Sequence, residues 1–372
     1  MNENNVEKFE QKLEKEYKRI EDSIEKPNVL LVGATGVGKS SLINLIFGEK
    51  LAKTGTGKPV TDAINIYRRP DSSVVLYDTA GYEIGSEKQE KFSEEVIDFA
   101  IDNQKSVNRQ IHLVWYCIDA AGHRITDLDI KTIKKIYEAN IPVGVIFTKC
   151  DLVSLEEIES LEEEIYKELP NIAKFRLTVI DHPKLNYLDL NQLISWSIER
   201  LPEALKIGFI KEQKRNLDEK KSEAGKAIKQ HVSGSVLVGG SPIPFSDAPI
   251  LITNQATMFA RIINIYDMEY IIKDAKMIIS GLGMKKLISG SGIWLASQLT
   301  KFIPGAGTVA GGVISASVAA TITTAIGYAT SEMCYRISKA AIEGKEEELK
   351  ELVNNFQPIL ADLFKEFYAK KS

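Results

Sequence analysis

The sequence predicts an α/β domain, with a mostly parallel sheet covered by helices on both faces, joined to an all-α domain. Apolar strand-like runs alternate with amphipathic helical stretches from residue 28 to about residue 202, which is typical of buried parallel strands connected by helices. After residue 205 this alternation ends and long helical periodicity replaces it. A chain of 372 residues is also longer than one ordinary domain.

The expected elements are these, in chain order. Residues 5–25 should form one amphipathic helix that Pro27 ends, because apolar side chains recur there at spacings of three and four. Strands are expected at 28–32, 63–67, 73–77, 111–118, 142–147 and 175–180. One helix should follow the first strand and end at Phe47, and three more should cover 128–139, 154–168 and 188–200. The expected domains are an N-terminal helix over 1–26 that packs on the helical domain, an α/β domain over 27–203, and an α-helical domain with a glycine-rich apolar hairpin over 204–372.

Composition narrows the classes of function. The 47 basic and 51 acidic side chains give a net charge of −4, which argues against a protein that coats nucleic acid. The three cysteines are too few and too far apart for a disulfide framework or a zinc site. The first ten residues are too polar for a secretion signal, so we expect a reducing, cytoplasmic location.

A glycine-rich motif follows the first apolar strand and opens a helix. It runs Gly33-Ala34-Thr35-Gly36-Val37-Gly38-Lys39-Ser40, with Ser41 next, and strand-loop-helix is the context that a phosphate-binding loop requires. Glycines let backbone N–H groups curl around a phosphate, and the helix N-terminus adds partial positive charge. Lys39 can neutralise the β and γ oxygens of a nucleotide, and the Ser40 hydroxyl can ligate Mg²⁺.

Two further motifs stand at strand ends behind this loop. Asp78-Thr79-Ala80-Gly81 can hold the Mg²⁺ shell through the carboxylate and meet a γ-phosphate through the Gly81 N–H. Thr148-Lys149-Cys150-Asp151 places a carboxylate where it can accept both the ring N–H and the amino group of guanine. Adenine lacks that pair of donors, so the Thr148–Asp151 motif favours the binding of guanine over adenine.

These three motifs resemble those of a GTPase of the Ras-like superfamily, closest to its Era-like branch, over about residues 28–203. The resemblance implies GTP hydrolysis with Mg²⁺, with GTP or GDP as the ligand. It implies a nucleotide site formed by Gly33–Ser41, Asp78, Gly81, Thr148, Lys149 and Asp151, and a Mg²⁺ site formed by Ser40, Asp78 and a switch threonine. Thr61 matches that threonine, with Thr54 and Thr56 as rivals in the same loop. Lys39, Thr61 and Gly81 would act in catalysis.

The chain departs from the Era-like pattern at several positions. Thr148 stands where Asn is usual, as it does in immunity-related GTPases, although a hydroxyl can still tie this loop to the phosphate loop. The sequence VIDHP (179–183) replaces the usual Ser-Ala, so the amide that meets the guanine oxygen is not identified. Tyr82 stands where Ras-like enzymes carry a water-orienting Gln, and Gly36 where potassium-activated relatives carry Asn. We therefore expect slow intrinsic hydrolysis.

Arg124 could supply the missing positioning as an arginine finger into a second copy. The alternative interpretation is an ordinary solvated arginine, or one paired with Asp127 or Asp129, and this is the favoured one.

The C-terminal part, about 225–370, resembles a bacterial helical domain of unknown function that is fused to Era-like GTPases. Residues 302–331 contain no charged side chain, and 287–331 contain only Lys301. That length would allow a membrane span, but small residues dominate it and also suit the centre of a tightly packed bundle. We favour the bundle and keep membrane contact through 287–331 as the alternative.

The expected function is a GTP-binding switch that hydrolyses GTP to GDP and phosphate. A membrane-associated mechanoenzyme of the dynamin-like or immunity-related type and a GTP-binding scaffold with negligible hydrolysis are the alternatives. A nucleotide-dependent homodimer through the GTPase domains and a peripheral membrane location remain open. Nucleic acid is not the expected partner, because the pI is acidic and no basic module follows the GTPase domain.

Overall fold

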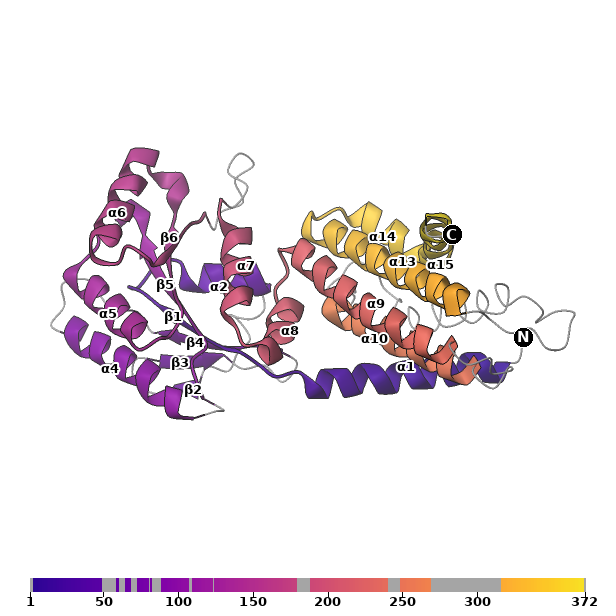
Figure 1. Cartoon of the computed structure of the whole chain (residues 1–372). Helices are drawn as coiled ribbons and strands as arrows, with labels where there is room; N and C mark the ends of the chain where they lie inside the picture. The colour runs from indigo at the N-terminus through magenta and orange to yellow at the C-terminus, as the bar shows by residue number, and fades with distance from the viewer. Residues whose placement is uncertain are drawn as a thin grey trace, which may run out of the picture. The chain divides into compact units, whose positions relative to one another are not determined.

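The structure is a computed structural model (Figure 1). It describes residues 3–48, 58–59, 64–67, 72–79, 81, 88–106, 109–122, 124–178, 188–239, 248–268 and 316–370. The chain divides into two compact units. The α/β unit comprises Ile24–Asn216, and the helical unit comprises Met1–Ser23 together with Leu217–Ser372.

The α/β unit is built on a seven-stranded sheet in the order β2-β3-β4-β1-β5-β6-β7. Its strands are β1 (Asn28–Val32), β2 (Lys58–Pro59), β3 (Ile64–Tyr67), β4 (Val75–Thr79), β5 (Leu113–Asp119), β6 (Val143–Thr148) and β7 (Ala173–Arg176). All pairs from β4 to β7 are parallel, while β2 and β3 are antiparallel additions at one edge. The predicted mostly parallel sheet is confirmed.

Helices cover both faces of this sheet, which explains why its central strands are mostly apolar. Figure 1 shows one layer formed by α4 (Lys88–Asp102), α5 (Asp127–Glu138) and α6 (Leu155–Glu168). The opposite layer contains α2 (Lys39–Phe47), α7 (Leu190–Arg200) and α8 (Glu203–Glu212). Every residue of β1 and β4 is buried between these layers.

The helical unit packs six described helices against one another. They are α1 (Glu3–Ser23), α9 (Leu217–Gly239), α10 (Ala248–Ile265), α13 (Ala316–Ile342), α14 (Glu346–Asn354) and α15 (Phe356–Ala369). Helix α13 packs on α9 and α15, and α1 packs on α10. The contact between α13 and α9 is close, since a Cβ added to Gly327 would lie 2.7 Å from Cγ1 of Ile228.

Part of the uncharged stretch is visible in α13. Ile322 and Ile326 of this stretch are buried in the bundle, at 1% and 0% exposure. Residues 287–315 lie outside the described residues, as do the side chains of 316–319. Within the described part of the chain, no helix combines the length and the apolar character needed to cross a bilayer.

The boundary between the units lies further along the chain than the expected residue 203. Residues 204–216, which we expected in the helical domain, belong to the α/β unit. Phe209 of α8 explains this, because its fully buried ring packs edge-on against Phe47 of α2 and Trp115 of β5. Apolar side chains of α8 thus complete the core of the α/β unit, a contact that helical periodicity alone does not reveal.

Candidate functional site

The glycine-rich loop leaves the carboxyl end of β1 and enters α2. Gly33, Gly36 and Gly38 have φ values of 143°, 76° and 101°, which side chains with a Cβ rarely adopt. At Gly33 space is also lacking, because an added Cβ would lie 2.3 Å from the carbonyl oxygen of Cys117. The sequence therefore uses glycine where the loop must turn and pass close to β5.

Lys39 is the first residue of α2 and points back into the loop. Its Nζ donates to the carbonyl oxygens of Gly33 at 2.8 Å and Ala34 at 3.0 Å. Burial lowers the pKa of Lys39, while the nearby Asp78 carboxylate opposes that shift. The ammonium group is thus fixed within the loop, as a counter-charge for phosphate must be. Thr35, Ser40 and Ser41 of the same motif are exposed.

Asp78 and Thr79 end β4 beside this lysine, and both are buried. Burial raises the pKa of Asp78 to about 6, against the opposing effect of Lys39. Among the described residues, nothing hydrogen-bonds to Oδ1 of Asp78 or to Oγ1 of Thr79. A buried carboxylate oxygen without a donor is costly unless a ligand satisfies it. These residues therefore fit a hydrated Mg²⁺ ion, for which carboxylate and hydroxyl oxygens are suitable partners.

Gly81 lies directly against the phosphate loop. Its φ is 80°, and an added Cβ would come within 2.8 Å of the backbone nitrogen of Thr35. The end of the Asp78–Gly81 motif is therefore in contact with the glycine-rich loop. The order of the motifs in the sequence predicts that the two lie close together, but it does not say which residues meet.

Thr148 joins the guanine motif to the phosphate loop. It ends β6 with no exposed surface, and its hydroxyl lies 2.6 Å from the carbonyl oxygen of Val37 and 3.1 Å from that of Ile118. The hydroxyl has one proton to donate, so it bonds one of these oxygens at a time or shares the proton between them. The structure thus shows the tie that we expected a hydroxyl to make in place of Asn.

Lys149 and Asp151 follow on the same loop. Lys149 has a left-handed backbone, with φ at 56°, and its Nζ forms an ion pair of 2.5 Å with Oδ2 of Asp119. The Asp151 carboxylate accepts a hydrogen bond of 2.8 Å from the hydroxyl of Thr178. These contacts hold the loop that would read the base.

Asp119 and Thr178 bond to the predicted guanine-binding loop, and neither is identified by the sequence motifs. Asp119 is the acidic end of β5, and Thr178 is a buried hydroxyl just after β7, so each stands at a carboxyl strand end beside a motif. The Thr178 hydroxyl that supports Asp151 lies one residue before 179–183, the segment that replaces the usual Ser-Ala. Residues 179–187 lie outside the described residues.

Of the remaining candidates, only Arg124 falls among the described residues. Thr61, its rivals Thr54 and Thr56, and Tyr82 lie outside the described residues. Arg124 is exposed, and none of the ion pairs in the described part of the chain involves it. Asp129, one partner considered for it, instead accepts hydrogen bonds from Tyr116 and Thr126.

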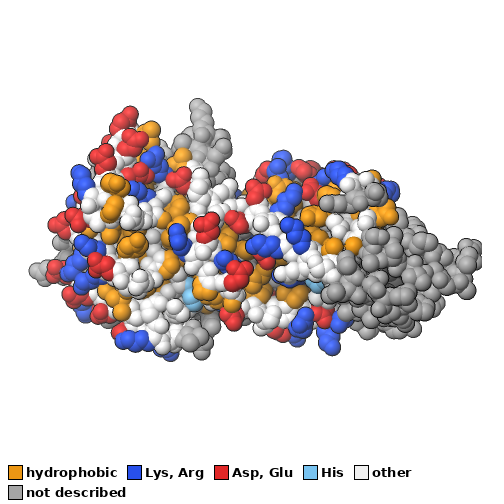
Figure 2. Space-filling model, viewed as in Figure 1, with side chains coloured by type: hydrophobic (Ala, Val, Ile, Leu, Met, Phe, Trp, Pro, Cys, Tyr) orange, Lys and Arg blue, Asp and Glu red, His pale blue; other side chains and the backbone are white. Residues whose placement is uncertain are grey.

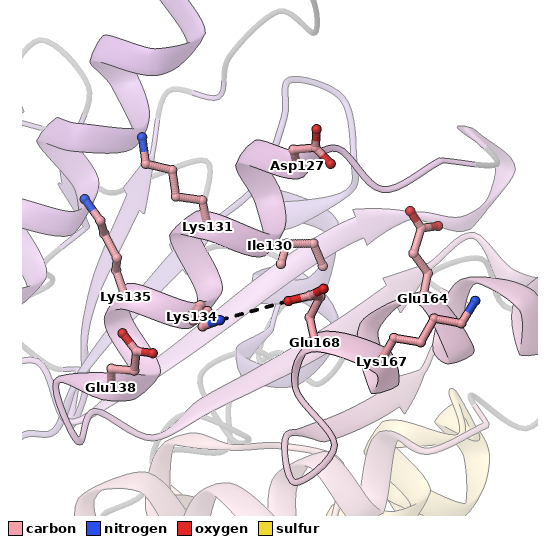
Figure 3. A pocket seen from close by; sticks show the side chains of 9 residues that line it. All are labelled: Asp127, Ile130, Lys131, Lys134, Lys135, Glu138, Glu164, Lys167 and Glu168. Atoms are coloured by element: carbon pink, nitrogen blue, oxygen red, sulfur yellow. Dashed lines mark ion pairs between the residues drawn. The ribbon is translucent and has the colours of Figure 1, made fainter.

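A separate pocket of about 580 Å³ lies between α5 and α6. Figure 3 shows lysine and carboxylate side chains around it, with Lys134 and Glu168 4.0 Å apart. Its lining consists of Asp127, Ile130, Lys131, Lys134, Lys135, Glu138, Glu164, Lys167 and Glu168. Four lysines and four acidic residues thus line the pocket, and no residue of the three motifs does. On the face seen in Figure 2, acidic and basic side chains are likewise interspersed.

Comparisons with known proteins find GTP-binding proteins among the chains that are similar in sequence. A family model described as "50S ribosome-binding GTPase" matches residues 28–149. The probable GTP-binding protein EngB of Aquifex aeolicus is 30% identical over 142 residues, which are 37% of this chain and 74% of that protein. EngB of Leuconostoc mesenteroides is 32% identical over 145 residues, which are 39% of this chain and 73% of that protein. A solved structure of a probable EngB is 21% identical with a TM-score of 0.34, covering 46% of this chain and 97% of that one.

Proposed function

The chain belongs to the Era-like family of P-loop GTPases, and we propose that it binds GTP with Mg²⁺, hydrolyses it slowly and changes conformation with the bound nucleotide. Membership of this family supports GTP binding. The use of Mg²⁺, the slow rate and the switch are proposals for this chain.

The phosphate end of the site supports the Mg²⁺ proposal. Two carbonyl oxygens hold Lys39 inside the loop, where its positive charge would neutralise negative charge on the β- and γ-phosphates. Ser40 and Asp78 would hold Mg²⁺, with Thr61 as the proposed third contact. When bound, the ion would offset negative charge on the phosphate oxygens. Gly81, in contact with the loop, would donate its N–H to the γ-phosphate.

One observation carries the choice of guanine. The Asp151 carboxylate is fixed by Thr178, and its loop is tied to the phosphate loop through Thr148 and Val37. To select a nucleoside triphosphate by its base, a protein must hold the base-binding group at a fixed position relative to the phosphate-binding loop.

The guanine proposal is tested by Asp151→Asn. The amide can donate to the oxygen that xanthine carries in place of the guanine amino group, whereas it leaves a guanine donor unpaired. An unpaired buried polar group costs about 1–3 kcal/mol, so preference should shift from GTP toward xanthosine triphosphate by on the order of tenfold or more. Competition binding against a fluorescent guanine nucleotide measures this shift.

The matched control is Asp119→Asn, which changes a carboxylate at the same sheet edge that pairs with Lys149. This variant should keep the preference for GTP. Undiminished preference for GTP in Asp151→Asn would remove the guanine assignment. Lys39→Ala should abolish tight binding of either triphosphate, because the phosphates lose their fixed counter-charge.

The alternative functions differ from the proposed one in the steps after nucleotide binding. A single-turnover assay separates slow hydrolysis from a scaffold that binds GTP without cleaving it. Turnover measured with and without lipid vesicles tests the mechanoenzyme. The concentration dependence of turnover tests a homodimer, and comparison with Arg124→Ala tests whether the exposed Arg124 acts in it.

A further inference from the structure

The chain leaves the α/β unit through the end of α8 and the turn that follows it, and most of the residues at this junction are buried. Lys211, Glu212 and Gln213 are at most 1% exposed, although polar connecting segments usually run over the surface. The Gln213 side chain closes the turn: its Oε1 accepts from the backbone N–H groups of Arg215 at 3.0 Å and Asn216 at 2.9 Å. Its Nε2 donates to the Asn216 carbonyl oxygen at 2.9 Å. We call Glu212–Asn216 the linker clasp.

The linker clasp holds the start of β4. The Glu212 carboxylate accepts a buried hydrogen bond of 2.7 Å from the backbone N–H of Ser73. One helical turn earlier, Gly208 lies so close that an added Cβ would be 2.8 Å from the Ser73 carbonyl oxygen. Strand β4 begins two residues after Ser73 and carries Asp78 near its other end. Glu212 is therefore connected to the phosphate site through one short, fully buried strand.

The linker clasp also holds the end of α2. The Lys214 N–H donates to the Ile46 carbonyl oxygen at 2.8 Å, and Nε of Arg215 donates to the Leu45 carbonyl oxygen at 2.9 Å. The last carbonyl groups of a helix lack partners within it, and a guanidinium group there also complements the helix dipole. Helix α2 begins at Lys39, so its opposite end forms part of the phosphate site.

We propose that the linker clasp couples the nucleotide site to the helical unit, with Glu212 and Arg215 as its positioning residues. It hydrogen-bonds to the C-terminal end of α2 and to Ser73 just before β4. The opposite ends of these two elements carry Lys39 and Asp78. The residue after the clasp, Leu217, begins α9. A nucleotide that shifts either element displaces a turn that continues directly into the helical unit. This inference rests on the proposed GTP switch, and the coupling is reciprocal by thermodynamic linkage.

The test compares two substitutions at Glu212 in the full chain. Glu212→Ala removes the acceptor for the Ser73 N–H, whereas Glu212→Gln keeps a neutral acceptor. Binding of GDP and of a non-hydrolysable GTP analogue is measured first, with Mg²⁺. Hydrogen exchange of the first turns of α9 is then measured with each nucleotide. Wild type and Glu212→Gln should show exchange that differs between the nucleotides by about fivefold or more, the lower end of typical coupling between linked sites.

Glu212→Ala should bind nucleotide but lose that difference in α9. Arg215→Ala against Arg215→Lys is the second pair, with the same expectation, in case Glu212→Ala does not fold. A wild type that binds both nucleotides with identical exchange in α9 would overturn the clasp while leaving the GTPase intact. A full nucleotide-dependent difference in both alanine variants would also overturn it. A wild type that binds no guanine nucleotide would overturn the proposed function itself.

Discussion

Thr148→Val is the sharpest probe of how the two halves of the site are joined. Valine has almost the shape of threonine, so the variant removes the hydroxyl donor without opening a cavity in this fully buried position. The Val37 carbonyl oxygen then loses its bond of 2.6 Å, and the Ile118 carbonyl oxygen its contact at 3.1 Å.

The expected magnitude depends on those two acceptors. Only one proton is lost, and leaving a buried acceptor unsatisfied costs about 1–3 kcal/mol. The free energy of unfolding of the α/β unit should fall by roughly that amount. Because Val37 belongs to the phosphate loop, part of the loss should also appear as weaker nucleotide binding. At about 1.4 kcal/mol per tenfold change, the whole 1–3 kcal/mol would raise the dissociation constants of GDP and GTP by about 5- to 150-fold, so the expected rise is a few-fold or more but below that limit.

Titration with a fluorescent guanine nucleotide measures the affinity, and denaturant unfolding without nucleotide measures the stability. Thr148→Ser is the matched control, since it keeps the hydroxyl and should bind close to wild type. If Thr148→Val binds GDP and GTP as tightly as the wild type, the hydroxyl tie does not organise the phosphate loop. If stability also stays unchanged, the bond itself contributes nothing.

Two further predictions concern stability. Gly327→Ala should lower the free energy of unfolding of the helical unit, measured in urea, by about 1–3 kcal/mol, because the new Cβ meets Ile228 at 2.7 Å. Gly225→Ala, whose Cβ would have no atom within 4 Å, should raise it by roughly 0.5–1 kcal/mol. Equal effects of the two variants would contradict the close packing of α13 on α9. His112 accepts the N–H of Asn28 at Nδ1 over 2.9 Å, and burial lowers the pKa of His112 below its usual 6.5. Its stabilising effect is present above about pH 6.5 and is lost as the pH falls through the lowered pKa of the folded state, because the unfolded chain takes up the proton first. The free energies of unfolding of wild type and His112→Gln should therefore converge as the pH falls. A difference between them that stays constant with pH would refute this.

Much of the α/β unit could be predicted because its determinants are local. Continuously apolar runs define the buried strands, and glycines at fixed spacing define the phosphate loop. Lys39 and Asp78 were identified because their chemistry is tied to a motif of consecutive residues. Thr178 was not identified, since a single buried threonine after a strand is common and has meaning only beside Asp151.

The sequence by itself determined the fold class, and it predicted the phosphate-binding loop and the carboxylate that we propose reads guanine, because each depends on residues adjacent in the chain. Only the tertiary structure decided that Thr148 ties that carboxylate's loop to Val37, 111 residues away in sequence. It also decided that α8 belongs to the α/β unit and that Glu212 reaches the Ser73 N–H across 139 residues. The physical reason is that a hydrogen bond between distant segments leaves no periodic or compositional pattern in either of them.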